Sequence, residues 1–157
     1  EAEEPADSEE PYLHTQQFLD AMKDEDLDDI CSYEGRNSAT NDDFVFVEDY
    51  LVVDDEEYDI DIVVLFSEDN EDINFRVWNL IDFDKEDMGD ILYLLNQYNY
   101  DWSCGKFYVD ETDDSVTLAI DLMVDADQDI SDVAVYALYL THVIAEDIAP
   151  DLLPYAK

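Results

Sequence analysis

Hydrophobic positions in the first half of the chain change from helical spacing to strict alternation. Residues 11–23 carry apolar side chains on one helical side, and Pro11 stands where a first helical turn tolerates proline. From residue 44 the period becomes two, and β-branched and aromatic residues fill the segments 44–53, 60–66 and 73–77. Short acidic turns join these segments, so the pattern predicts one helix followed by three strands in an antiparallel meander.

The second half returns to helical spacing, alternates again and ends on a long apolar stripe. The predicted segments are a helix over residues 85–98, two strands over 106–110 and 116–124, and a helix over 130–148. Asp129 or Ser131 can cap the last helix, and we expect Pro150 to end it. The element order α-β-β-β-α-β-β-α indicates an α+β fold, with three helices and a five-stranded antiparallel sheet.

The beginning of the chain differs in composition from the remainder. Residues 1–11 are acidic, contain proline and lack large apolar side chains, so we expect a flexible acidic arm. Residues 12–157 are expected to form a single domain. Hydrophobic residues make up 47% of the chain and aromatic residues 13%, which is enough for a folded core despite a formal net charge of -39.

The charge arises from 45 acidic residues against 6 basic ones, and it has three possible explanations. An acidic surface can steer association with a basic protein. It can imitate the phosphates of DNA and block a nucleic-acid-binding protein. It can also be a halophilic adaptation, because concentrated counterions screen the repulsion within a compact molecule. The sequence leaves these alternatives open.

The same charge argues against two classes of partner. Phosphate is repelled and the basic residues are scattered, so we expect no direct binding of nucleic acid. Anionic lipid is disfavoured for the same reason, and no apolar stretch approaches the length of a membrane span. We therefore expect a cytoplasmic protein. Cys31 and Cys104 lack a metal-binding spacing, and two buried free thiols are favoured over one disulfide.

No motif singles out a catalytic, cofactor or metal site. Carboxylate pairs catalyse only where a pocket separates their pKa values, and neighbouring acids in the sequence do not establish such a pocket. The alternating acids of residues 24–28 and 125–129 lack the glycine and final glutamate of a calcium loop. His14 and His142 lack a zinc spacing and are expected to be surface or partly packed residues. We expect a non-enzymatic protein.

Tyrosines and acids together indicate a protein-binding surface. Aromatic residues gather around the second predicted helix and recur on the third. Core packing accounts for most aromatic side chains, whereas exposed ones rimmed by acid can hold Arg or Lys through ionic and cation–π contacts. The candidate partner-binding residues are Asp54, Asp55, Glu56, Glu57, Tyr93, Tyr98, Trp102, Tyr136 and Tyr139.

Residues 94–100, LLNQYNY, lead into residues 105–110, GKFYVD. This run and the order of elements resemble the YbjN-type bacterial domains, which share the fold of type III secretion chaperones. The resemblance extends over residues 12–155 and implies a non-enzymatic, protein-binding and often dimeric domain. We therefore expect a chaperone-like or regulatory module whose acidic faces steer a basic protein and whose apolar helix–sheet groove holds it, with a homodimer as a further expectation.

Overall fold

The computed structural model describes residues 10–157, so most of the predicted arm at residues 1–11 lies outside the described residues. Within this range one antiparallel sheet has the strand order β1-β2-β3-β4-β6-β5. The strands are β1 Cys31–Arg36, β2 Asp43–Val53, β3 Glu56–Phe66, β4 Asp72–Asp82, β5 Lys106–Asp110 and β6 Ser115–Met123. The helices are α1 Leu13–Asp24, α2 Met88–Asp101 and α3 Ser131–Leu152, with short 3₁₀ helices at Lys85–Asp87 and Leu153–Tyr155.

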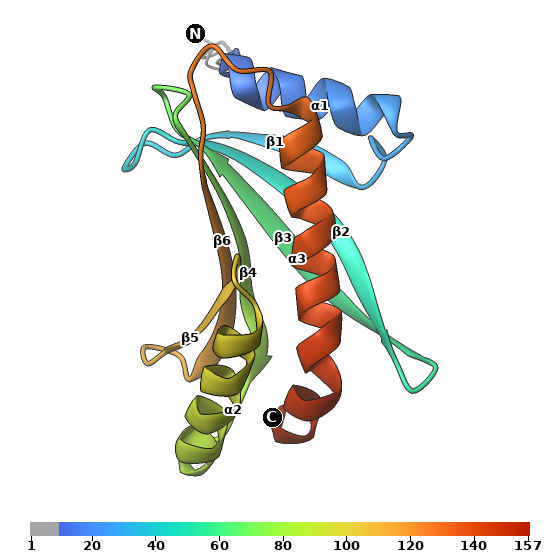
Figure 1. Ribbon diagram of the computed structural model, residues 1–157, viewed down its shortest axis with the longest axis vertical. Helices are drawn as coiled ribbons and strands as arrows, with labels where there is room; N and C mark the ends of the chain where they lie inside the picture. Colours follow the sequence, from blue (N-terminus) through green and yellow to red (C-terminus); the bar gives the residue numbers. More distant parts are fainter. Residues whose placement is uncertain (1–9) are drawn as a thin grey trace, which may run out of the picture.

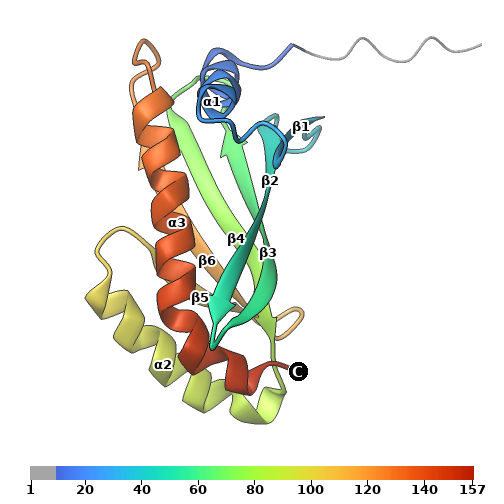
Figure 2. The same cartoon turned by 90° about the vertical axis from the view of Figure 1, so that its right-hand side faces the viewer.

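The helices lie on one side of the sheet (Figures 1 and 2). The long helix α3 runs along the middle of the sheet, with α1 near its first turns and α2 beside its last ones (Figure 1). Apolar side chains of β2, β3, β4 and β6 alternate toward α3, as the period of two predicts. The α+β class and the three helices are confirmed.

The predicted five-stranded sheet is wrong because the structure has a sixth strand, β1, at one edge. This strand pairs with β2, but its side chains are exposed or only half-buried. Its register shifts between Tyr33 and Gly35, and Gly35 has a φ of 96°, which favours glycine. A short, half-exposed and bulged edge strand leaves no alternation of apolar residues in the sequence.

Pro150 does not end α3, contrary to the sequence expectation. The helix continues to Leu152 and passes directly into the 3₁₀ helix Leu153–Tyr155. Proline removes one backbone donor, yet Leu152 is fully buried in the core and holds the last turn in place. Tertiary packing therefore overrides the local stop signal at this end of the helix.

The sheet divides into two halves that diverge along its length. Pairing between β3 and β4 covers four positions, from Val63↔Arg76 to Phe66↔Ile73. Beyond them, the β2–β3 hairpin turns away from β4, β6 and β5, and α3 lies over the opening (Figure 1). We call this opening the sheet split. It places the end of α3 between two sets of strands.

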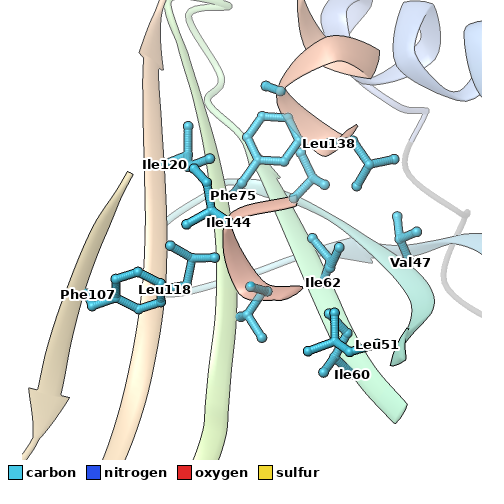
Figure 3. Packing of buried hydrophobic residues seen from close by; sticks show 14 of the residues in the cluster. Val47, Leu51, Ile60, Ile62, Phe75, Phe107, Leu118, Ile120, Leu138 and Ile144 are labelled. Carbon is cyan, nitrogen blue, oxygen red and sulfur yellow. The ribbon is translucent and has the colours of Figure 1, made fainter. Parts of the chain in front are cut away.

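The core fills the space between α3 and the diverging strands. Phe75, Leu118 and Ile120 project toward Ile144 of α3, while Ile62 contributes from β3 (Figure 3). Gly105, just before β5, lies so close to this layer that a Cβ atom there would stand 3.0 Å from Ile144 Cδ1. The close approach of helix and strand explains glycine at this position.

Candidate functional site: an acidic groove between two helices

A groove of about 630 Å³ lies between α1 and the first turns of α3. We call it the acidic groove. Its lining residues are Gln17, Asp20, Ala21, Asp24 and Glu25 on the side of α1, and Asp129, Ser131, Asp132, Val135, Tyr136 and Tyr139 on the side of α3. Five of these eleven residues are acidic and none is basic. The groove therefore concentrates negative charge between two rigid elements.

Asp129 stays ionised in the groove at unusually low pH. Its carboxylate accepts hydrogen bonds from the Ser131 hydroxyl at 2.6 Å and from the Ser131 backbone N–H at 3.0 Å. These two donors lower the pKa of Asp129, with a smaller contribution from His14. The residue in the N-cap position of α3 is Ile130, and the carboxylate of Asp129 satisfies the next backbone donor.

Two tyrosines form the exposed aromatic wall of the groove. Tyr136 and Tyr139 lie three residues apart on α3, so they share one helical side. Their side chains are 60% and 62% exposed, and neither hydroxyl has a hydrogen-bond partner among residues 10–157. Exposed aromatic faces beside unpaired carboxylates can hold a guanidinium or ammonium group.

Buried Asp43 positions the α1 wall of the groove. Its carboxylate is fully buried at the start of β2 and accepts four hydrogen bonds. The donors are the Tyr12 backbone N–H at 2.7 Å, the Thr15 hydroxyl at 2.7 Å, the Tyr33 hydroxyl at 2.9 Å and Arg36 Nε at 3.0 Å. Because Tyr12 occupies the N-cap position of α1, the carboxylate satisfies a helix terminus from a distant strand.

Asp43 was not singled out from the sequence, although its position in the alternating pattern of β2 indicates that it is buried. It shares the inward phase of β2 with Val45, Val47 and Leu51, all of which are buried. A carboxylate at a buried position needs hydrogen-bond or ionic partners, so such a residue is a candidate for holding other elements in place. Asp49 has the same phase, and its carboxylate lies 2.7 Å from Nδ1 of His142 on α3.

The two histidines differ in their surroundings. His142 is half-buried between Asp49 and Glu146, whose carboxylate lies 3.4 Å from Nε2, so the expectation of a partly packed residue is confirmed. His14 is fully buried and its Nε2 lies 3.0 Å from the Gln128 carbonyl oxygen, so the same expectation is wrong for it. His14 joins α1 to the loop that leads into α3.

Tyr98 and Trp102 lie at the opposite end of α3 and use their polar atoms within the molecule. The Tyr98 hydroxyl donates to the Asp151 carboxylate at 2.5 Å, and Trp102 Nε1 donates to Asp147 at 3.0 Å. Burial and the Asp151 carboxylate raise the pKa of Tyr98. We call these contacts the aromatic clamp, because they fasten α2 to α3.

The other candidate residues lie apart from the groove. Asp54 and Asp55 form the two-residue turn of the β2–β3 hairpin, while Glu56 and Glu57 are already the first residues of β3. Tyr93 is 69% exposed on α2. The structure thus brings together two of the nine predicted residues, Tyr136 and Tyr139, with acids of α1 that the sequence did not single out.

Other candidate chemistry is sparse in the described part of the chain. Cys31 and Cys104 are free, but Cys31 is only half-buried and Cys104 is exposed, so the expectation that both thiols are buried is wrong. Burial raises the pKa of the Cys31 thiol to about 11, with a further contribution from Asp28. Within residues 10–157 no cluster of three or more His, Cys, Asp or Glu side chains could hold a metal ion, and no helix could span a membrane.

Comparison with known proteins identifies the family. The sequence model of the YbjN family, described as "Putative bacterial sensory transduction regulator", matches residues 39–138. This chain belongs to the YbjN family. The matched part of this YbjN-family chain runs from the loop before β2 to the middle of α3, so it includes the sheet split and the groove tyrosine Tyr136.

The crystal structure of YbjN from E. coli, named "a putative transcription regulator", is similar at a TM-score of 0.46 and 14% identity. The similarity covers 87% of this chain and 89% of that one. No curated protein matches the sequence. Membership of the YbjN family agrees with a regulatory or binding domain and with the resemblance noted in residues 94–110.

Proposed function

We propose that this YbjN-family chain is a non-enzymatic regulatory module that binds a basic segment of another protein in the acidic groove. The carrying observation is that five carboxylates and two exposed tyrosines line one groove without any basic residue. Negative charge steers a basic partner toward the groove, and aromatic faces add short-range affinity for its cations.

Arginine fits this groove better than lysine. A guanidinium group can stack on a tyrosine ring while it donates two parallel hydrogen bonds to a carboxylate. Tyr136 and Tyr139 lie beside Asp132 on the α3 wall, and Asp20 and Asp24 form the facing wall on α1. A segment with two or more arginines can therefore contact both walls. The family description as a sensory transduction regulator supports a binding role of this kind.

The test compares two pairs of exposed tyrosines. A short arginine peptide is titrated into the wild-type protein, into a Tyr136→Ala and Tyr139→Ala variant, and into a Tyr93→Ala and Tyr100→Ala control. The control tyrosines are 69% and 90% exposed on α2, outside the groove. We expect affinity to fall about tenfold in the groove variant, because each exposed cation–π contact contributes about 0.5–1 kcal/mol, and to change little in the control.

A matching lysine peptide provides the second arm of this experiment. We expect it to bind more weakly than the arginine peptide and to be less sensitive to the loss of Tyr136 and Tyr139. Equal losses in the groove variant and the α2 control would show that general charge attraction, and not the groove, holds the peptide. That outcome would overturn the assignment of the groove. The predicted homodimer stays a prediction.

A further inference from the structure

The β2–β3 hairpin has one protected edge and one open edge. Beyond β1, the backbone N–H groups along β2 find acceptors: Glu48 on the Ile30 carbonyl at 2.9 Å, Tyr50 on the Asp49 carboxylate at 2.8 Å and Val52 on the Glu146 carboxylate at 3.4 Å. On the opposite edge, the ladder between β3 and β4 stops at Val63. An unpaired strand edge is a template for another strand.

The hairpin turn determines which groups face the sheet split. Asp54 and Asp55 have φ values of 51° and 65°, as in a type I′ turn, whose two flanking residues form a hydrogen-bonded pair. Alternation along the ladder then directs the backbone N–H and C=O groups of Glu57, Asp59 and Asp61 away from β2. No loop or side-chain acceptor bonds these three N–H groups within residues 10–157.

An apolar pocket of about 260 Å³ lies against this open edge. Ile60 forms one wall, Leu80 and Ile81 of β4 form the facing wall, and Ala149 and Leu153 close it at the end of α3. The pocket therefore lies within the sheet split. It combines an apolar floor with backbone groups that have no strand partner.

Charge alternates with apolar surface along the same stretch of β3. The side chains of Glu57, Asp59 and Asp61 are exposed, whereas Ile60 and Ile62 between and beside them are buried toward α3. Successive side chains of a strand point to opposite faces. A strand added here would place every second residue beside a carboxylate and the residues between them over the pocket.

We propose that the open edge of β3 binds an extended segment of another protein in which Lys or Arg alternates with a medium-sized apolar residue. The segment pairs with the backbone of residues 57–61, which span about 17 Å at the usual rise of a strand. Its apolar side chains enter the pocket and its cations face Glu57, Asp59 and Asp61. This is β-strand addition with charge-selected register.

The same charges disfavour a second copy of this chain at the open edge. Pairing two β3 edges would bring carboxylates of one copy opposite carboxylates of the other, and like charges directly opposite each other destabilise a strand pair. The site is separate from the acidic groove and does not depend on it. A variant that disables one site should leave the other intact.

The experiment uses an acetylated and amidated peptide of sequence Lys-Val-Lys-Val-Lys-Val-Lys. A scrambled peptide keeps its composition but groups the lysines, and an N-methylated peptide keeps its side chains but blocks the backbone donors on one edge. We expect hydrogen exchange at the amides of Glu57, Asp59 and Asp61 to slow on binding of the alternating peptide. Each control peptide should bind about tenfold more weakly, because it loses several strand hydrogen bonds or the pocket contacts.

Two protein variants test where the alternating peptide binds. Ala149→Leu fills the pocket, and Asp59→Lys removes an acid beside the open edge. Both variants should bind the alternating peptide more weakly than the wild type. Glu111→Lys makes the same change of charge in an exposed turn and should leave that affinity unchanged. The inference is overturned if the scrambled peptide binds equally well, if Asp59→Lys and Glu111→Lys behave alike, or if the three amides are already protected without peptide, as in a dimer through this edge. Retained binding in the Tyr136→Ala and Tyr139→Ala variant would separate this site from the groove.

Discussion

Aromatic residues lie next to aspartates at both ends of α3, but the two ends use them differently. In the aromatic clamp, Tyr98 and Trp102 donate their polar hydrogens to Asp151 and Asp147, so the acids are partnered within the chain. In the acidic groove, the hydroxyls of Tyr136 and Tyr139 have no partner among the described residues. The same residue types therefore fasten two helices at one end and remain open to a ligand at the other.

The largest difference should appear when one aromatic side chain is truncated at each end. Trp102→Ala removes a half-buried ring that packs on the core, so we expect the free energy of unfolding to fall by about 2–3 kcal/mol. Tyr136→Ala removes an exposed ring and should change it by no more than about 0.5 kcal/mol. Urea denaturation measures both. Equal losses would show that the groove tyrosines are structural.

Removal of single hydroxyls should sharpen this contrast. Tyr98→Phe loses a hydrogen bond to a carboxylate and should cost about 1–2 kcal/mol, whereas Tyr139→Phe should have almost no effect. The raised pKa of Tyr98 gives this contribution a pH dependence. It is fully present below the ordinary tyrosine pKa and is lost as pH rises above about 10 toward the raised value. Urea midpoints measured across alkaline pH should fall more steeply for the wild type than for Tyr98→Phe.

Replacement of aspartate by asparagine should change the free energy of unfolding in opposite directions at the two ends of α3. Asp147→Asn weakens the acceptor for Trp102 Nε1 and should lower the free energy of unfolding by about 1 kcal/mol. Asp20→Asn combined with Asp132→Asn relieves repulsion across the groove and should raise it by a few tenths of a kcal/mol at low salt. Molar KCl should abolish the second effect by screening. A stabilisation that persists in molar KCl would contradict this electrostatic explanation.

The smallest expected effect concerns Asp129. Its lowered pKa means that its contribution to stability is present at neutral pH and is lost as pH falls below the ordinary aspartate value of 3.8. Asp129→Asn removes that titration, so the wild type should lose slightly more stability than the variant on acidification. Thermal unfolding measured from neutral to strongly acidic pH checks the difference. A Ser131→Ala variant, which removes the hydroxyl donor, should behave as an intermediate case.

Much of the fold could be predicted because most elements bury one face. The alternation in β2, β3 and β6 and the apolar stripe of α3 are direct records of that burial. β1 left no such record because its residues are exposed or half-buried and Gly35 interrupts its register. Asp43 and Asp49 are the opposite case, because their place in the inward phase of β2 marks them in the sequence as acids that need partners.

The candidate site was less predictable because its acids and aromatics resemble those elsewhere in the chain. The partners of Tyr98 and Trp102 lie 53 and 45 residues away in sequence, so no local pattern distinguishes a clamp residue from a free one. The wall of the groove on α1 depends in turn on Asp43, which is 31 residues from the Tyr12 backbone it holds. Such long-range contacts are set by packing and not by spacing.

The sheet split also determines how this molecule can assemble during synthesis. All six strands precede α3 in the chain, and the four paired positions between β3 and β4 are a narrow junction for the two half-sheets. The β1, β2 and β3 half can form from two successive hairpins, whose contacts are local and fast, whereas β6 pairs both with its neighbour β5 and with the sequence-distant β4. The apolar surfaces of the halves nevertheless remain exposed to water until α3 packs against them and Ile144, Ile148 and Leu152 fill the space between them. The last helix thus completes the core. A nascent chain that lacks α3 exposes the apolar faces of both half-sheets and is prone to aggregate.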